Sequence, residues 1–235
     1  DDGQTWSKPQ EITQQLIKKP HWQEWSPVHT GIQINFGIYK GRLMVPVRCY
    51  CPDKDPSPHE LKYQHNGIIY SDDGGVSWVP AGRSESRVGE CSIAERSDGS
   101  LYVNHRTSAD STRKAERMHN MSKDGGVTFT ACTYSGLSDA RCHAGLTVLT
   151  ESSGRRLFLF TNVPGSKRTG LTISINEDEG ETWILKRVIE SSHSAYSDIA
   201  VLPDQTILCV YETGEQISRQ NLALTRFNLA WIFSR

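Results

Sequence analysis

One short pattern of residues recurs along the chain and constrains its fold more than any other feature. A Ser or Asn is followed two residues later by Asp, four residues later by Gly and seven residues later by an aromatic residue. The copies comprise Ser71, Asp73, Gly75 and Trp78; Ser122, Asp124, Gly126 and Phe129; Asn176, Asp178, Gly180 and Trp183; and, as a second half only, Asp1, Gly3 and Trp6. We call this unit the Asp-turn. Its repetition indicates a fold built from similar units.

The residue types in the Asp-turn are those of a tight hairpin turn. An Asp side chain accepts hydrogen bonds from backbone N–H groups a few residues ahead, and Gly adopts backbone angles that other residues resist. The aromatic residue is expected to anchor the turn to the core. We therefore expect the Asp-turns to join strands and to have a structural role.

Apolar runs rich in strand-forming residues lie between the Asp-turns. They span residues 43–47, 101–103, 157–160 and 206–210, and each follows a turn signal. The Asp residues of the Asp-turns lie at positions 1, 73, 124 and 178, which are steps of about the size of a four-stranded repeat. The chain is therefore predicted to be all-β and to form a β-propeller.

The two ends of the chain carry weaker signals. A short helix is expected within residues 9–25, around Ile12, Leu16 and Ile17. After the last Asp-turn, strands are expected near 195–202, 206–212 and 220–226, and residues 229–233 are expected to extend the last of them.

Composition excludes several classes of partner. The chain has 235 residues and a formal net charge of -1, which gives no reason to expect nucleic acid. It contains no apolar run long enough for a transmembrane segment. The six cysteines have no zinc-like spacing and are expected to be buried thiols, and no metal or cofactor is expected. The compartment stays open, with a secreted or periplasmic location slightly favoured over a cytoplasmic one.

Five further segments carry a more specific signal. They are Gly-Arg-Leu-Met-Val-Pro at 41–46, Gly-Glu-Cys-Ser-Ile at 89–93 leading to Asn-His-Arg at 104–106, Lys-Arg-Thr-Gly-Leu at 167–171, Ala-Tyr-Ser-Asp at 195–198 and Val-Tyr-Glu at 210–212. In order and spacing they resemble the sialidase (neuraminidase) family of the bacterial and animal exo-α-sialidase type, whose Asp boxes correspond to the Asp-turns. The resemblance runs along nearly all of the chain.

The resemblance implies a six-bladed β-propeller, of which residues 1–235 form a partial domain of about four blades. It places the N-terminal blades, the family's first arginine and its acid/base aspartate upstream of residue 1. A missing N-terminal segment or a second chain would then be needed to close the propeller, and these 235 residues alone are expected to hydrolyse sialosides poorly.

The resemblance also implies roles for individual residues in cleaving a terminal sialic acid from a glycan. Tyr196 corresponds to the nucleophile and Glu90 to the base that takes its proton. Arg106 and Arg168 correspond to two of the three arginines that hold the sugar's carboxylate, which an arginine fork suits. Glu212 corresponds to the acidic residue that steadies the first arginine. A covalent tyrosyl intermediate implies retention of configuration.

Strand direction predicts where these residues lie. Glu90 and Tyr196 begin the first strand of a blade, and Arg106 and Glu212 end the following strand. Because adjacent strands are antiparallel, these positions share one edge of the blades. The Asp-turns join third and fourth strands and are expected at the opposite edge.

Three more positions are candidates for substrate binding. Tyr50 corresponds to a family position near the sugar's glycerol tail, Arg48 stands where some relatives have a tyrosine, and His143 stands where some animal relatives have a glutamine. The charged residues at 95, 96 and 113–117 are expected on a solvated face.

Other functions remain open on this sequence. A non-catalytic propeller that binds sialylated glycans would not need the nucleophile pair. A trans-sialidase would use the same intermediate with a sugar acceptor, and a related nonulosonic acid could replace sialic acid as substrate.

Overall fold

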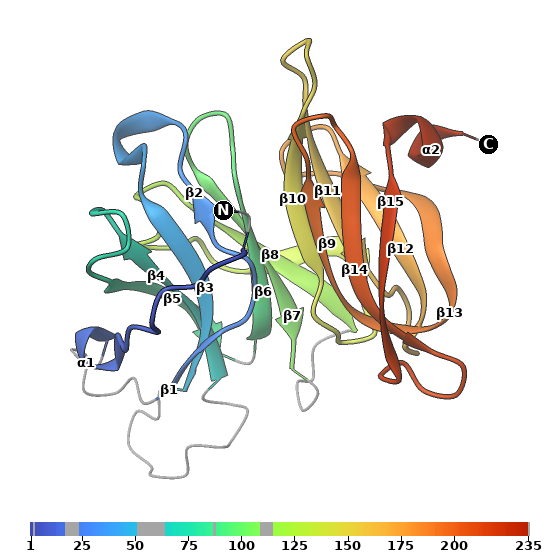
Figure 1. Cartoon of the computed structure of the whole chain (residues 1–235), viewed down its shortest axis with the longest axis horizontal. Helices are drawn as coiled ribbons and strands as arrows, with labels where there is room; N and C mark the ends of the chain where they lie inside the picture. The colour runs from blue at the N-terminus through green and yellow to red at the C-terminus, as the bar shows by residue number, and fades with distance from the viewer. Residues whose placement is uncertain (2, 17–23, 51–63, 87, 109–114, 235) are drawn as a thin grey trace.

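The computed structural model describes residues 1, 3–16, 24–50, 64–86, 88–108 and 115–234, and it shows three antiparallel sheets side by side (Figure 1). The first sheet contains β1 (Glu24–Pro27), β2 (Ile32–Gln33), β3 (Leu43–Tyr50), β4 (Gln64–Ser71) and β5 (Val79–Ser86). The second contains β6 (Val88–Glu95), β7 (Leu101–Thr107), β8 (Glu116–Ser122) and β9 (Thr133–Ser138). The third contains β10 (Gly145–Thr150), β11 (Arg156–Asn162), β12 (Thr169–Asn176), β13 (Trp183–Val201), β14 (Ile207–Gly214) and β15 (Asn221–Phe227).

The third sheet consists of two units that share one strand. The 19-residue strand β13 pairs with β12 from Trp183 to His193 and with β14 from His193 to Val201. The shared strand therefore ends one four-stranded unit and begins the next. The strands expected from the apolar runs are all present, as β3, β7, β11 and β14.

The hydrophobic core lies between the sheets. Strand β6 is buried along its whole length, because the first and third sheets pack on either side of it. Phe158 and Phe160 of β11 pack against Tyr102 of β7, and all three side chains are fully buried. Rings of this size contribute about 1.5–3 kcal/mol each on burial, so this contact holds the second sheet to the third.

Each complete Asp-turn joins the third strand of a unit to the fourth, as β4–β5, β8–β9 and β12–β13. The Asp carboxylate accepts a hydrogen bond from the backbone N–H four residues ahead, at 2.9 Å for Ser77, 2.8 Å for Thr128 and 2.8 Å for Thr182. In the half copy, the Trp6 indole donates to the Gly3 carbonyl at 3.1 Å, as Trp78 does to Gly75. These bonds close the turns locally.

Several expectations about the chain were wrong. Residues 229–233 form a helix, α2 (Leu229–Phe233), because the Asn228 side chain accepts from Trp231 N and caps it. By contrast, the short helix expected within residues 9–25 is present as α1 (Thr13–Leu16), Ile17 lies outside the described residues, and residues 24 and 25 begin β1. Glu95 is buried, because its carboxylate accepts from the backbone N–H groups of Asn35 and Phe36, both at 2.8 Å.

Cys49, Cys91, Cys142 and Cys209 are buried as expected, Cys132 is only half-buried, and Cys51 lies outside the described residues. Among the helices of the described ranges, none has the length and apolar character needed to cross a bilayer.

Substitutions at two glycines of the Asp-turns allow the cost of backbone strain to be compared with the cost of a steric clash. Gly75 and Gly180 have φ of +92° and +112°, which disfavour any other residue. A Cβ at Gly75 would meet nothing closer than 3.8 Å, whereas one at Gly180 would lie 2.3 Å from the Tyr102 ring. Gly75→Ala should therefore lower the free energy of unfolding by about 1–2 kcal/mol, and Gly180→Ala by a further ~1–3 kcal/mol. Urea denaturation of the full-length protein measures both, and equal losses would contradict this account.

Candidate active site

The candidate site is centred on the phenol of Tyr196. Its hydroxyl donates to Glu90 Oε1 at 2.5 Å. Arg106 Nη1 donates both to Glu90 Oε2 at 2.5 Å and to the Tyr196 hydroxyl at 2.9 Å. Tyr196 comes from the third sheet, and Glu90 and Arg106 come from neighbouring strands of the second. A carboxylate and a guanidinium thus hold one phenol between two sheets.

Both Glu90 and Tyr196 lie where the strand pairing is irregular. Between Val88 and Cys91, β6 carries one residue more than the partner segment of β7. Between Ser194 and Ser197, β13 likewise carries one more than β14. An extra residue of this kind redirects the side chains near it, and such bulges are common beside active sites. The two bulges turn Glu90 and Tyr196 toward each other.

The environment of Tyr196 keeps its phenol protonated. Burial and the adjacent Glu90 carboxylate raise the pKa of Tyr196 above its ordinary value, and Arg106 opposes them. Burial would lower the pKa of Arg106, but Glu90 and the Tyr196 phenol leave it raised above its ordinary value. At neutral pH the phenol is therefore protonated and uncharged, and the Glu90 carboxylate that accepts its hydrogen bond is the nearest group able to take its proton.

Arg168 and Glu212 also contact Tyr196. The guanidinium carbon of Arg168 lies 5.6 Å from the centre of the Tyr196 ring. Its Nη2 donates to the Arg141 carbonyl at 3.2 Å. Glu212 Oε2 accepts from the backbone N–H of Tyr196 at 3.3 Å. Two arginines therefore approach the phenol, one at its hydroxyl and the other at its ring.

His143 lies against another part of the phenol ring, with its ring centre 5.8 Å from that of Tyr196. His29 follows at 5.2 Å from His143. Burial, then the neighbouring His29, lower the pKa of His143 to about 3. Its imidazole is therefore neutral at physiological pH, and its Nδ1 has no hydrogen-bond partner among the described residues.

A buried ion pair holds the segment that carries His143. Arg117 of β8 is fully buried and donates to Asn104 Oδ1 at 2.7 Å and to the Cys142 carbonyl at 2.8 Å. Its Nη1 lies 3.5 Å from the carboxylate of Asp139, which is also fully buried. The expectation that Arg117 belongs to a solvated face was therefore wrong. Its burial fixes residues 139–143 between the second and third sheets.

Tyr50 and Arg48 lie on the first sheet, whereas the other candidates come from the second and third. Tyr50 ends β3, and its side chain lies outside the described residues. Arg48 pairs with Ser26 of β1 and Asn66 of β4. The structure thus assembles six of the eight candidates, Tyr196, Glu90, Arg106, Arg168, Glu212 and His143, and leaves these two on a separate sheet.

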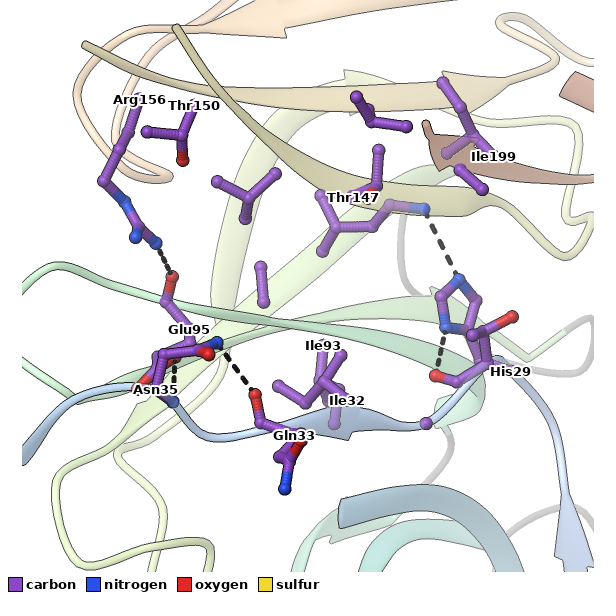
Figure 2. A pocket seen from close by; sticks show the side chains of 17 residues that line it. His29, Ile32, Gln33, Asn35, Ile93, Glu95, Thr147, Thr150, Arg156 and Ile199 are labelled. Carbon is purple, nitrogen blue, oxygen red and sulfur yellow. Dashed lines mark hydrogen bonds between the residues drawn. The ribbon is translucent and has the colours of Figure 1, made fainter. Parts of the chain in front are cut away.

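A cavity of about 350 Å³ lies between β2, β6, β10 and β13 (Figure 2). Aliphatic side chains such as Ile32, Ile93 and Ile199 and polar ones such as Gln33, Thr147 and Thr150 line it together, and Glu95 and Arg156 lie at one end. Because the Glu95 carboxylate is occupied by backbone donors, that end has a structural role. His29 lies at the other end and connects the cavity to His143.

Sequence reasoning missed His29, Asp198, Arg117 and Asp139. Asp198 lies in the Ala-Tyr-Ser-Asp segment, and its carboxylate accepts from Thr30 Oγ1 at 2.5 Å and lies 3.4 Å from His29 Nε2. Membership of this segment is the sequence feature that could have identified Asp198 as a candidate site residue. The other three residues carry no local signal. Within the described ranges, no group of three or more His, Cys, Asp or Glu side chains is placed to hold a metal ion.

Residues 1–210 match the family described as the BNR repeat-like domain. The chain is 29% identical over 240 residues to a sialidase of Micromonospora viridifaciens, covering 99% of this chain and 34% of that relative. The chain thus spans about a third of the length of the curated relatives it matches.

Solved structures are similar along the whole chain. The Hadza microbial sialidase Hz136 has a TM-score of 0.82 at 27% identity, covering 99% of this chain and 43% of that one. The intramolecular trans-sialidase from Ruminococcus gnavus has a TM-score of 0.77 at 21% identity, covering 100% of this chain and 50% of that one. These likenesses identify the architecture as a β-propeller-type fold.

The Arg117–Asp139 pair should matter to stability far more than a surface pair. Arg117→Ala leaves the Asp139 carboxylate buried with its charge unbalanced, so it should lower the free energy of unfolding by about 3–5 kcal/mol. Arg155→Ala removes an exposed pair with Glu177 and should change stability little. Denaturant titration of both full-length variants provides the comparison, and similar small losses would contradict the structural role of Arg117.

The pKa of Tyr196 should depend on Glu90. Glu90→Gln removes a negative charge that disfavours the phenolate, so the pKa of Tyr196 should fall. Ultraviolet difference titration of the full-length protein measures it, with Tyr196→Phe identifying the signal. An unchanged or higher pKa in Glu90→Gln would show that the two groups are not coupled.

Proposed function

This chain belongs to the BNR repeat-like domain family and to the sialidases, and on that premise we propose that it carries the nucleophile half of a retaining exo-α-sialidase site. The substrate is a glycan ending in sialic acid. The observation that supports this most is the Tyr196 hydroxyl held between Glu90 and Arg106.

In the proposed reaction, the Tyr196 oxygen attacks the anomeric carbon while its proton passes to Glu90. The bond to the leaving-group oxygen breaks, and that oxygen takes a proton from an acid that the resemblance places outside this chain. Water, deprotonated by a base, then attacks the same carbon while the bond to the Tyr196 oxygen breaks and that oxygen regains its proton from Glu90, so the configuration is retained.

The charge of the substrate favours a tyrosine in this position. Sialic acid has a carboxylate on the carbon under attack, and a carboxylate nucleophile would be repelled by it. A neutral phenol avoids this repulsion, and the raised pKa of Tyr196 keeps the phenol neutral until Glu90 accepts its proton. In this proposal Arg106 and Arg168 hold the substrate carboxylate through paired N–H donors.

The surrounding residues have supporting roles in this proposal. Glu212 orients Tyr196 through its backbone N–H and steadies the family's first arginine. His143 presents a neutral imidazole to the bound sugar, and Tyr50 and Arg48 contact its far end. The Asp-turns are structural and take no part in the chemistry.

We further propose that residues 1–235 form one partial domain of a six-bladed propeller, contributing about four blades. The coverage of only 34% of a curated relative supports further segments that complete it. These come from the longer protein or from a second chain.

Substitution at the phenol tests the mechanism. In the full-length protein, Tyr196→Phe should abolish turnover of a fluorogenic sialoside and also abolish covalent labelling by a fluorinated sialosyl donor, read by intact mass. Glu90→Gln should lower kcat by about 10²–10⁴-fold, because the base is lost. The matched control is Tyr134→Phe on β9, which should keep both activities.

Three outcomes would change the proposal. Turnover by Tyr196→Phe at the parent rate would remove the tyrosine mechanism. No turnover by the folded parent would favour the glycan-binding propeller. A sialosyl product transferred to a sugar, or to the substrate's own hydroxyl, would replace hydrolysis by transfer through the same intermediate.

A further inference from the structure

A second cavity, of about 500 Å³, lies beside the candidate site. It is lined by Arg168, by His193 of β13, and by Gln216, Ile217, Ser218 and Arg219 from the turn between β14 and β15. Figure 1 shows this turn at the lower end of β14 and β15, opposite α2. Arg168 contacts the Tyr196 ring as well, so the cavity and the candidate site share one arginine.

Hydrogen bonds to backbone carbonyls hold the walls of the cavity in place. Ser194 N donates to the Arg168 carbonyl at 3.0 Å, and Thr213 Oγ1 donates to the His193 carbonyl at 3.0 Å. The turn folds tightly onto its own base: a Cβ at Gly214 would lie 2.1 Å from the Ile217 carbonyl oxygen. The cavity is therefore bounded by a turn of defined shape.

The charge of the lining has one sign. Arg168 and Arg219 are cations, and no carboxylate is among the described residues that line the cavity. The nearest carboxylate on β13, that of Glu190, accepts from Ser192 N and Oγ at 2.9 and 2.8 Å, so it is engaged elsewhere. Glu215, in the same turn, is exposed and does not line it. The cavity favours an anion.

The distance from Tyr196 fits a neighbouring sugar. His193 precedes Tyr196 by three residues on β13, and the bulge between Ser194 and Ser197 keeps this separation below the ~10 Å of a regular strand. A group one monosaccharide beyond the reacting sugar can span that distance. The volume is also within the range of roughly 300–1,000 Å³ that is typical of small-molecule sites.

On the basis of the proposed function, we propose that this cavity is a subsite for an anionic group on the sugar next to the terminal sialic acid. A carboxylate or a sulfate supplies the matching chemistry, because both accept paired N–H donors from arginine. Arg219 is the specificity-determining residue, since Arg168 also serves the terminal sugar.

The test compares three substrates in the full-length protein: a sialyl-lactose, the same glycan with a second sialic acid, and a sialyl-lactose bearing a sulfate on the adjacent hexose. Arg219→Gln should lower the ratio of kcat/KM for an anionic substrate over the neutral one by about tenfold. Arg155→Gln makes the same charge change at the far end of the third sheet, next to Glu151 and Glu177, and should leave the ratio unchanged. An effect on only one anionic substrate identifies carboxylate or sulfate as the group recognised.

A binding measurement separates this proposal from the proposed function. In the full-length Tyr196→Phe background, calorimetry should show weaker binding of the anionic glycan when Arg219 is also replaced by Gln. That result, combined with no turnover by the folded full-length parent, would keep the subsite and remove the sialidase activity. The opposite outcome is normal turnover by the parent with no effect of Arg219→Gln on the kcat/KM ratio or on the affinity for the anionic glycan. It would overturn the subsite and keep the proposed sialidase activity.

Discussion

The Tyr196 hydroxyl donates to Glu90 across 106 residues of sequence, and this bond depends on how the second sheet meets the third. The two sheets are held together by the aromatic contact of Phe158 and Phe160 with Tyr102 and by the buried Arg117–Asp139 pair. Neither set of residues touches the phenol. Because a hydrogen bond tolerates only a few tenths of an ångström, the geometry of the site is set by this packing.

Local irregularities in two strands bring the side chains of Tyr196 and Glu90 together. A regular strand alternates its side chains between two faces, and an extra residue in β6 and in β13 breaks this alternation beside Glu90 and beside Tyr196. The Asp-turns lie at the other ends of the strands, where they close hairpins through their own hydrogen bonds. The candidate site and the Asp-turns thus lie at opposite edges of the sheets, so a substitution in an Asp-turn need not disturb the candidate site.

The sequence predicts the strands, the Asp-turns and the residues around the phenol, because each of these depends on a local pattern or a motif. It does not predict the burial of Arg117 or Glu95, since their partners lie on other segments of the chain. Arg117 contacts Cys142 and Asp139. Glu95 accepts hydrogen bonds from Asn35 and Phe36. A run such as Arg-Lys-Ala-Glu-Arg is locally typical of an exposed segment.

The helix α2 was not predicted for a different reason. Its apolar pattern also suits a strand, and a single cap at Asn228 decides in favour of the helix. His29 reaches the site only through the fold, by way of His143.

The shared strand β13 has a consequence for motion. His193 is paired with Thr169 on one side and with Gly214 on the other, so β12 and β14 are both bonded to one continuous backbone. Local opening of one unit therefore strains the other, and we expect the amides of the two units to exchange with solvent as one cooperative group rather than as two. Because Tyr196 lies on this shared strand, the cost of displacing it is spread over two units of the fold.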